Sequence, residues 1–133
     1  MFTFHFIVIA AITRFEDILA WQKARVLVKK VYDVCDSGKL KKDFGLKDQL
    51  CRAAVSSMTN IAEGFGRKND KEFIRFLDYS WGSTHEVQSL LYVAFDNESI
   101  SQEIFDTLYN DANEVASLIA GFSNYLQKSI GRK

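Results

Sequence analysis

Apolar residues recur at intervals of three and four along most of the chain, the spacing expected of helices that bury one face. This pattern predicts four helices, at about residues 15–36, 44–65, 70–95 and 101–126. The residues predicted to face the core are Trp21, Ala24, Leu27, Val28, Val31, Val34, Cys35, Leu50, Ala54, Met58, Ile61, Phe65, Phe73, Leu77, Ser80, Thr84, Val87, Leu91, Ala94, Ile104, Leu108, Val115, Ile119, Phe122 and Leu126. Helices of this length with short links predict an all-α fold, an antiparallel up-down four-helix bundle.

The helix ends carry residues typical of caps and stops. Asp43 is placed to cap the second helix and Asn69 the third, where Glu72 completes a capping box. Gly64 and Gly66 mark the end of the second helix. The composition agrees with a helical fold, since the 133 residues include no proline and only seven glycines, whereas sheet proteins need many turn residues.

Several large apolar residues lie outside the predicted core stripes: Val26, Tyr32, Ile74, Trp81 and Tyr92. Either the core is wide enough to bury them, or the chain associates with itself. Self-association is the favoured interpretation, because a monomer rarely exposes a contiguous apolar patch.

Charge is unevenly distributed, although the formal net charge is zero. Residues 21–52 contain nine Lys/Arg against four Asp/Glu, whereas residues 69–124 contain ten Asp/Glu against two Lys/Arg. The first half therefore predicts a basic surface for phosphates, unless the oppositely charged helices simply lie side by side. The candidate phosphate-binding residues are Lys23, Arg25, Lys29, Lys30, Lys39, Lys41 and Lys42, with Arg67 and Lys68 as a second group.

A polar pattern follows the second and third predicted helices. Its members are Gln49, Arg52, Ser56, Asn60, Glu63 and Arg67 on the second helix, and Arg75, Tyr79, Ser83 and Glu86 on the third. These groups make directional hydrogen bonds, unlike the Lys and Glu of an ordinary solvent face. In an antiparallel pair, Glu63 and Arg67 are expected near Arg75, and Arg52 near Glu86. We interpret the pattern as a structural polar seam that fixes the register of the two helices.

Signatures of catalysis are scarce. His5 and His85 are the only histidines, too few for a triad or a multi-histidine metal site. The stretch Gly64-Phe65-Gly66 ends a helix, whereas a phosphate-binding loop opens one after a strand. The sequence therefore predicts no enzyme activity, no metal and no cofactor.

The two cysteines, Cys35 and Cys51, have no metal-binding spacing and are interpreted as small buried residues in a reducing compartment, so a cytoplasmic location is expected. Residues 1–13 form an apolar extension, either translated upstream of the natural start or docked on a subunit interface. They are too short to span a bilayer and lack the basic start of a secretory signal, so no membrane association is expected. Residues 14–128 are assigned to the bundle and residues 129–133 to a basic C-terminal tail.

Two segments, QLCRAAVSSMTNIAEGFGR and EFIRFLDYSWGSTHE, resemble the four-helix-bundle family of 23S rRNA intervening-sequence proteins. The matching positions are Gln49, Leu50, Arg52, Ala53, Ala54, Ser56, Asn60, Ile61, Ala62, Glu63, Gly64, Gly66, Arg67, Glu72, Phe73, Arg75, Phe76, Leu77, Gly82, Ser83 and Glu86. The stretch FEDILAWQKA matches the usual opening of the family, and the resemblance covers about residues 14–128.

The resemblance implies a ring-shaped homo-oligomer, a homopentamer, with no enzymatic activity. Members are named after reading frames within bacterial large-subunit rRNA genes, and a similar bundle is the accessory protein of diversity-generating retroelements. Together with the basic segment, this predicts a non-catalytic oligomer that binds nucleic acid, with RNA favoured. The alternative is a protein-interaction scaffold that docks a partner such as a reverse transcriptase or a ribosomal component.

Overall fold

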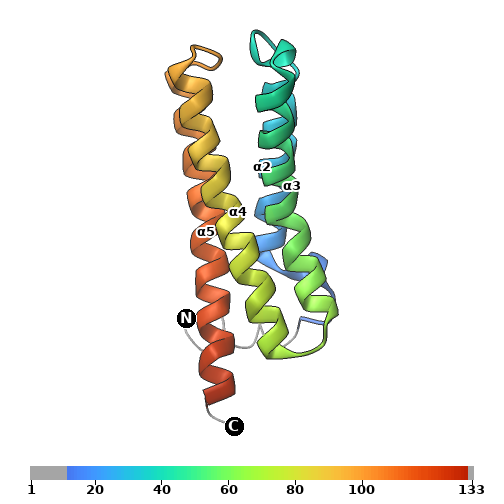
Figure 1. The fold of residues 1–133 in the computed structure, drawn as a ribbon. Helices are drawn as coiled ribbons and strands as arrows, with labels where there is room; N and C mark the ends of the chain where they lie inside the picture. The colour runs from blue at the N-terminus through green and yellow to red at the C-terminus, as the bar shows by residue number, and fades with distance from the viewer. Residues whose placement is uncertain (1–11, 132–133) are drawn as a thin grey trace.

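The computed structural model describes residues 12–131, which form four long helices and two short 3-10 helices and contain no strand. The long helices are α2 (Leu19–Cys35), α3 (Phe44–Gly66), α4 (Asp70–Asp96) and α5 (Gln102–Gly131), and the short ones are η1 (Phe15–Asp17) and η2 (Leu40–Lys42). Consecutive long helices run in opposite directions and lie side by side (Figure 1). The prediction of an all-α, antiparallel four-helix bundle is confirmed.

Two of the helix starts are fixed by the predicted caps. The Asp43 carboxylate accepts a hydrogen bond from the Leu46 N–H at 3.2 Å, and the Asn69 side chain accepts one from the Glu72 N–H at 3.1 Å. The capping box at α4 is only half formed, because the Glu72 carboxylate instead accepts from Arg75. Local side-chain hydrogen bonds of this kind satisfy the free N–H groups of a first helical turn.

The first long helix begins later than the sequence pattern predicts. Residues Phe15–Asp17 form the 3-10 helix η1, and Ile18 is extended, with φ −77° and ψ 119°, before α2 begins. At the other end of the chain α5 continues to Gly131, into the segment assigned to a tail. The prediction for residues 1–13 lies outside the described residues except at Ile12 and Thr13.

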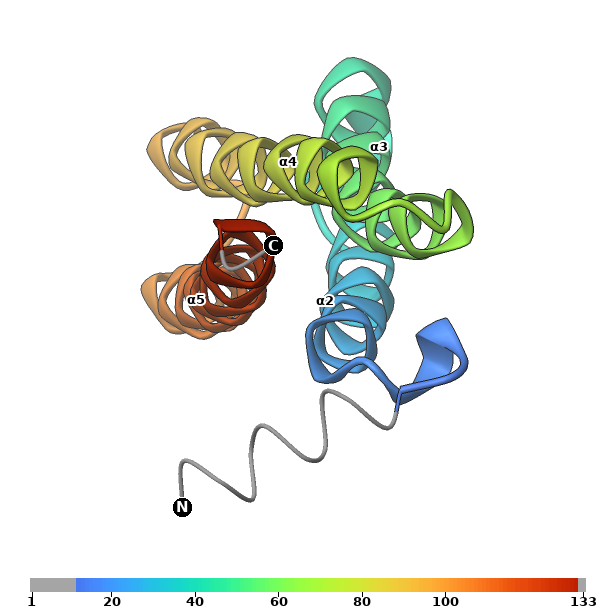
Figure 2. The same ribbon diagram turned by 90° about the horizontal axis from the view of Figure 1, so that it is seen from below.

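The core lies between all four helices, which surround it when the bundle is viewed along its axis (Figure 2). Most predicted core residues are buried, and six lie half-buried at its margin: Val28, Val34, Met58, Phe65, Ile104 and Phe122. The two polar core positions, Ser80 and Thr84, are fully buried. Their hydroxyls are hydrogen-bonded, Ser80 to the Ser57 carbonyl across the α3–α4 contact and Thr84 to the Trp81 carbonyl within α4.

The apolar residues outside the stripes mostly remain on the surface. Val26, Tyr32, Trp81 and Tyr92 are exposed, whereas Ile74 packs against the core. A wide core therefore accounts for only one of the five. Among the described residues, no helix is long and apolar enough to cross a membrane.

Candidate nucleic-acid interface and polar seam

The centre of the polar seam joins α3 to α4 as predicted. The hydroxyl oxygens of Ser56 and Ser83 are hydrogen-bonded at 2.9 Å across the two helices. The Asn60 side-chain amide donates to both the hydroxyl and the carbonyl oxygen of Ser56, each at 2.9 Å. Ser83 is buried and the other two are half-buried, so these bonds form where water has limited access. Fixed hydrogen bonds between two helices at one point define their register.

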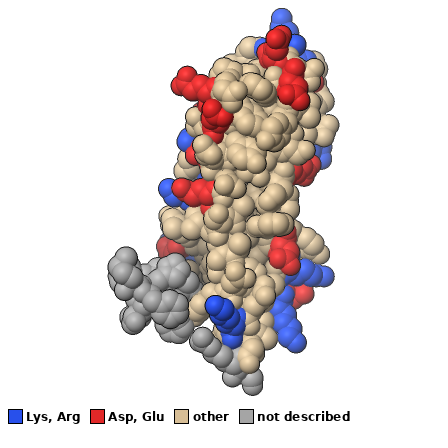
Figure 3. Space-filling model, turned by 90° about the vertical axis from the view of Figure 1, so that its left-hand side faces the viewer, with Lys and Arg blue, Asp and Glu red and all other residues tan. Residues whose placement is uncertain are grey.

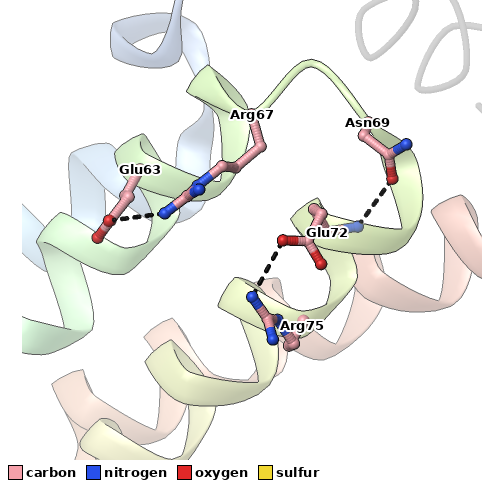
Figure 4. A network of polar contacts seen from close by, with 5 residues as sticks. All are labelled: Glu63, Arg67, Asn69, Glu72 and Arg75. Atoms are coloured by element: carbon pink, nitrogen blue, oxygen red, sulfur yellow. Dashed lines mark hydrogen bonds and ion pairs between the residues drawn. The ribbon is translucent and has the colours of Figure 1, made fainter.

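The ends of the seam differ from the prediction. Arg52 pairs with Asp48 of the same helix, α3, at 2.9 Å. Arg67, at the C-terminal end of α3, pairs with Glu63 at 3.3 Å, and Arg75 pairs with Glu72 of α4 at 3.0 Å (Figure 4). The expected nearness of Arg67 and Arg75 is confirmed at the Phe76 ring, but no ion pair joins Arg75 to Glu63 or Arg52 to Glu86. Residues three or four apart on one helix are already neighbours, so these pairs need no exact helix crossing.

An aromatic ring lies beneath the two guanidinium groups at this end of the seam. The Arg67 and Arg75 guanidinium carbons lie 4.8 and 5.7 Å from the centre of the Phe76 ring. Tyr79, which is exposed, meets the same ring edge to face at 5.6 Å. Gln49 and Glu86, at the far end of the two stripes, are exposed. Only the middle of the predicted seam is therefore internal.

Three of the predicted phosphate-binding lysines are paired with carboxylates. Lys23 lies 3.4 Å from Glu114 and Lys30 lies 2.7 Å from Asp111, both across the α2–α5 contact. Lys29 lies 2.8 Å from Asp33 within α2. The alternative interpretation, that oppositely charged helices lie side by side, holds for this part of the molecule. Lysines whose charge is already balanced have less to gain from a phosphate.

Of the remaining basic candidates, all but Arg25 lie at the two ends of the bundle. The lysine turn, defined as Lys39, Lys41 and Lys42, spans η2 between α2 and α3. The Lys39 ammonium donates to the Asn97 carbonyl oxygen at 2.7 Å, which ties this turn to the end of α4. Within residues 12–131, Lys41 and Lys42 are exposed and have no ion pair. Of the predicted phosphate-binding residues, Lys41 and Lys42 are therefore two that the described structure leaves exposed without a carboxylate partner.

The other two basic residues are less favourably placed. Arg25 is exposed on α2 with its guanidinium 5.8 Å from the centre of the Trp21 ring. Lys68 is exposed in the α3–α4 turn, where its φ of 57° places the backbone in the left-handed region. Lys68 lies at the opposite end of α3 from the lysine turn and Arg25 lies within α2, so the nine candidates do not form one basic surface.

Two features of the structure were not predicted from the sequence. The first is the interaction between Cys35 and Cys51, which burial and periodicity hinted at, since both lie on apolar faces of adjacent helices. Burial, followed by the interaction with Cys51, raises the pKa of the Cys35 thiol from 9.0 to about 12.

Among the described residues, no group of three or more His, Cys, Asp or Glu is arranged to hold a metal ion.

The second missed feature is an uncharged strip along α4 and α5 (Figure 3). Residues 115–127 of α5 contain no Lys, Arg, Asp or Glu, and residues 79–92 of α4 contain only Glu86. Trp81 and Tyr92, 45% and 50% exposed, lie on this part of α4. The signal was present in the sequence as a long interval without charge.

The fold and its surfaces define a helical bundle with a polar seam and a basic turn. The profile of the 23S rRNA-intervening sequence protein family matches residues 16–121, and the chain belongs to this family. A similar solved structure is that of a protein with unknown function from the S23 ribosomal protein family of Bacteroides thetaiotaomicron, with a TM-score of 0.72 and 20% identity over 79% of this chain and 98% of that one. A comparison with curated proteins gives no match. Neither description names a catalytic activity.

Proposed function

We propose that the protein is a non-catalytic, cytoplasmic, oligomeric nucleic-acid-binding protein and that RNA is its ligand. The lysine turn supplies the contact. The observation that supports this is that the lysines of the turn and those of α2 differ in their ion pairs. Lys41 and Lys42 are exposed without an ion pair in the described chain, whereas Lys23 and Lys30 are paired with α5. An ammonium group without a carboxylate partner is free to replace the counterions of a phosphate backbone.

Oligomerisation increases the affinity for RNA that so small a basic group can provide. One copy offers only a few phosphate contacts, and several copies bound to one RNA convert later contacts into intramolecular ones. We place the self-association on the uncharged strip of α4 and α5, because two copies can cover it without burying an unpaired charge. The ring-shaped pentamer expected from the family resemblance is the assembly we propose.

The test is the affinity of the purified protein, stripped of nucleic acid, for a labelled structured RNA across a salt series. The variant Lys41→Gln/Lys42→Gln removes two free charges, and the control Lys23→Gln/Lys29→Gln removes two paired ones. We expect the first variant to bind more weakly and to lower the slope of log K against log[salt] by about 1.4–1.8 per protomer in contact. The control should lose much less.

Equal affinity of the Lys41→Gln/Lys42→Gln variant and the unaltered protein would refute the role of the lysine turn. Circular dichroism on both double variants checks that each retains its helices. Lys39 is left unaltered because its ammonium holds the Asn97 carbonyl oxygen, so its replacement would mix binding with stability.

The second candidate function is a protein-interaction scaffold, for which the acidic end of α4 and α5 provides the surface. Asp96, Glu98 and Glu103 are exposed there and form no ion pair with any described residue. A basic partner, such as a reverse transcriptase or a ribosomal component, fits this surface by charge. Absence of RNA binding at low salt in the assay above would favour the scaffold over the RNA-binding protein.

A further inference from the structure

Two thiols meet where the end of α2 packs on the beginning of α3. Cys35 is the last residue of α2 and has no exposed surface. Cys51 is the eighth residue of α3, packs against the core and is only half-buried. The Cys51 side chain is near enough to act on the ionisation of the Cys35 thiol. The two thiols therefore belong to adjacent helices, and Cys51 packs against the core cluster that contains Cys35.

Only one of the two thiols opens to solvent. Cys51 lines a surface hollow together with Tyr32, Phe44, Gly45, Lys47 and Asp48. Cys51 thus forms part of the wall of an open hollow, whereas Cys35 is fully buried in the core. The position of Cys51 on the surface and of Cys35 beneath it gives the pair an outer and an inner member.

The electrostatics assign different roles to the two members. Burial first, and then the neighbouring Cys51, raise the pKa of Cys35 to about 12, although the Lys47 ammonium acts in the opposite direction. Cys35 therefore stays a protonated thiol at neutral pH. The thiolate is the form that attacks an oxidant, so the first step falls to the accessible Cys51.

We propose that Cys35 and Cys51 form a redox-sensitive pair that hydroperoxides oxidise to an intramolecular disulfide. The Cys51 thiolate attacks the terminal peroxide oxygen, the O–O bond breaks, and the departing alkoxide takes a proton and leaves as an alcohol, or as water from hydrogen peroxide. Cys51 becomes a sulfenic acid. The Cys35 sulfur then attacks the Cys51 sulfur, the S–O bond breaks, and the hydroxide leaves as water with the Cys35 proton. Two thiols are oxidised by two electrons and one peroxide is reduced.

The disulfide encloses the segment that carries the lysine turn. Residues 36–50 lie between the two cysteines and include η2 and the start of α3. Closing a loop of this length restricts the unfolded chain, so the oxidised protein is expected to melt about 5–10 °C above the reduced one. The inference does not depend on RNA binding, because its readouts are the thiols and the melting temperature.

The experiment treats the reduced full-length protein with one equivalent of hydrogen peroxide. We expect intact mass spectrometry to show a monomeric chain that has lost two hydrogen atoms, and peptide mapping to place the bond between residues 35 and 51. Dithiothreitol should reverse the change. If both thiols persist under these conditions, or if only intermolecular disulfides form, the proposal is wrong.

Single variants separate the two roles. In Cys35→Ser the Cys51 sulfenic acid should persist and react with dimedone, whereas in Cys51→Ser the Cys35 thiol should resist the peroxide. Cys35→Ala replaces Cys35→Ser if the buried hydroxyl prevents folding. Oxidation of Cys35 in the Cys51→Ser variant at the rate seen for Cys51 would overturn the assignment of outer and inner thiol.

Discussion

Position 64 leaves no room for a side chain where α3 crosses α4. A methyl carbon on Gly64 would lie 2.7 Å from Cβ of Phe76 and 2.9 Å from Cδ1 of Phe73. We expect Gly64→Ala to destabilise the fold by about 1–3 kcal/mol, because the helices must separate to relieve the overlap. Urea unfolding followed by circular dichroism measures the change.

Gly82 provides the matched control for Gly64. It lies inside α4 and a methyl group there meets no atom within 4 Å. Gly82→Ala is expected to stabilise the protein by about 0.5–1 kcal/mol, since alanine loses less backbone entropy in a helix. The same sign of change in both variants would contradict the close approach of α3 and α4 at Gly64.

Single residues were predictable where their partners are local in sequence. The caps at Asp43 and Asn69 were found because an N-cap bonds within its own first turn. The ends of the seam were not, because two kinds of pair competed for each guanidinium. The chain offers Arg67 a partner four residues away in Glu63, and that pair forms in place of one across the helices.

At the scale of helices, the packing of α2 against α5 determines which lysines of α2 are paired with carboxylates of α5. Lys30 and Asp111 are separated by 2.7 Å and are only about half exposed, whereas Lys29 and Asp33 on α2 lie mostly in water. We expect a double-mutant cycle with Lys30→Met and Asp111→Asn to give a coupling of about 0.5–1 kcal/mol. The equivalent cycle for Lys29 and Asp33 should give less, because solvent screens that pair more strongly.

Chemical denaturation at low and high salt measures both couplings. A coupling near zero for Lys30 and Asp111 would mean that this ion pair contributes nothing to the packing of α2 on α5. A larger value for the exposed pair would contradict the argument from screening.

The helices were predictable from the sequence, and their charge pairing was not. Periodicity and caps act over a few residues, so the bounds of α3 and α4 agree with the pattern to within one residue. Which lysines meet which carboxylates depends on the neighbours of α2, and α2 contacts both α3 and α5. A list of basic residues therefore overstates the basic surface, because Lys23 and Lys30 balance charges on α5.

For the whole molecule, the uncharged strip of α4 and α5 is the surface on which the proposed assembly depends. The sequence predicted unburied apolar residues, and Trp81 and Tyr92 are among those that the structure leaves exposed. The packing of α4 on α5 was needed to place them, and it sets the Tyr92 ring against Phe105 and Tyr109 of α5, with ring centres 4.9 and 5.9 Å away. Figure 3 shows the uncharged face on which the proposal rests. An assembly that covers this strip rests on apolar contact more than on ion pairs.

Sedimentation of the full-length protein tests this assembly. We expect an oligomer at about 0.1 M and about 1 M NaCl alike, because salt screens charges but strengthens apolar contact little. The variant Trp81→Arg should shift the protein to the monomer, since an arginine on the strip would be buried without a partner. Val26→Arg on α2 is the control, because Val26 is 50% exposed against 45% for Trp81 and lies away from the strip. Unchanged assembly of Trp81→Arg, or dissociation of both variants, would remove the strip from the interface and leave the RNA contacts of each copy to act alone.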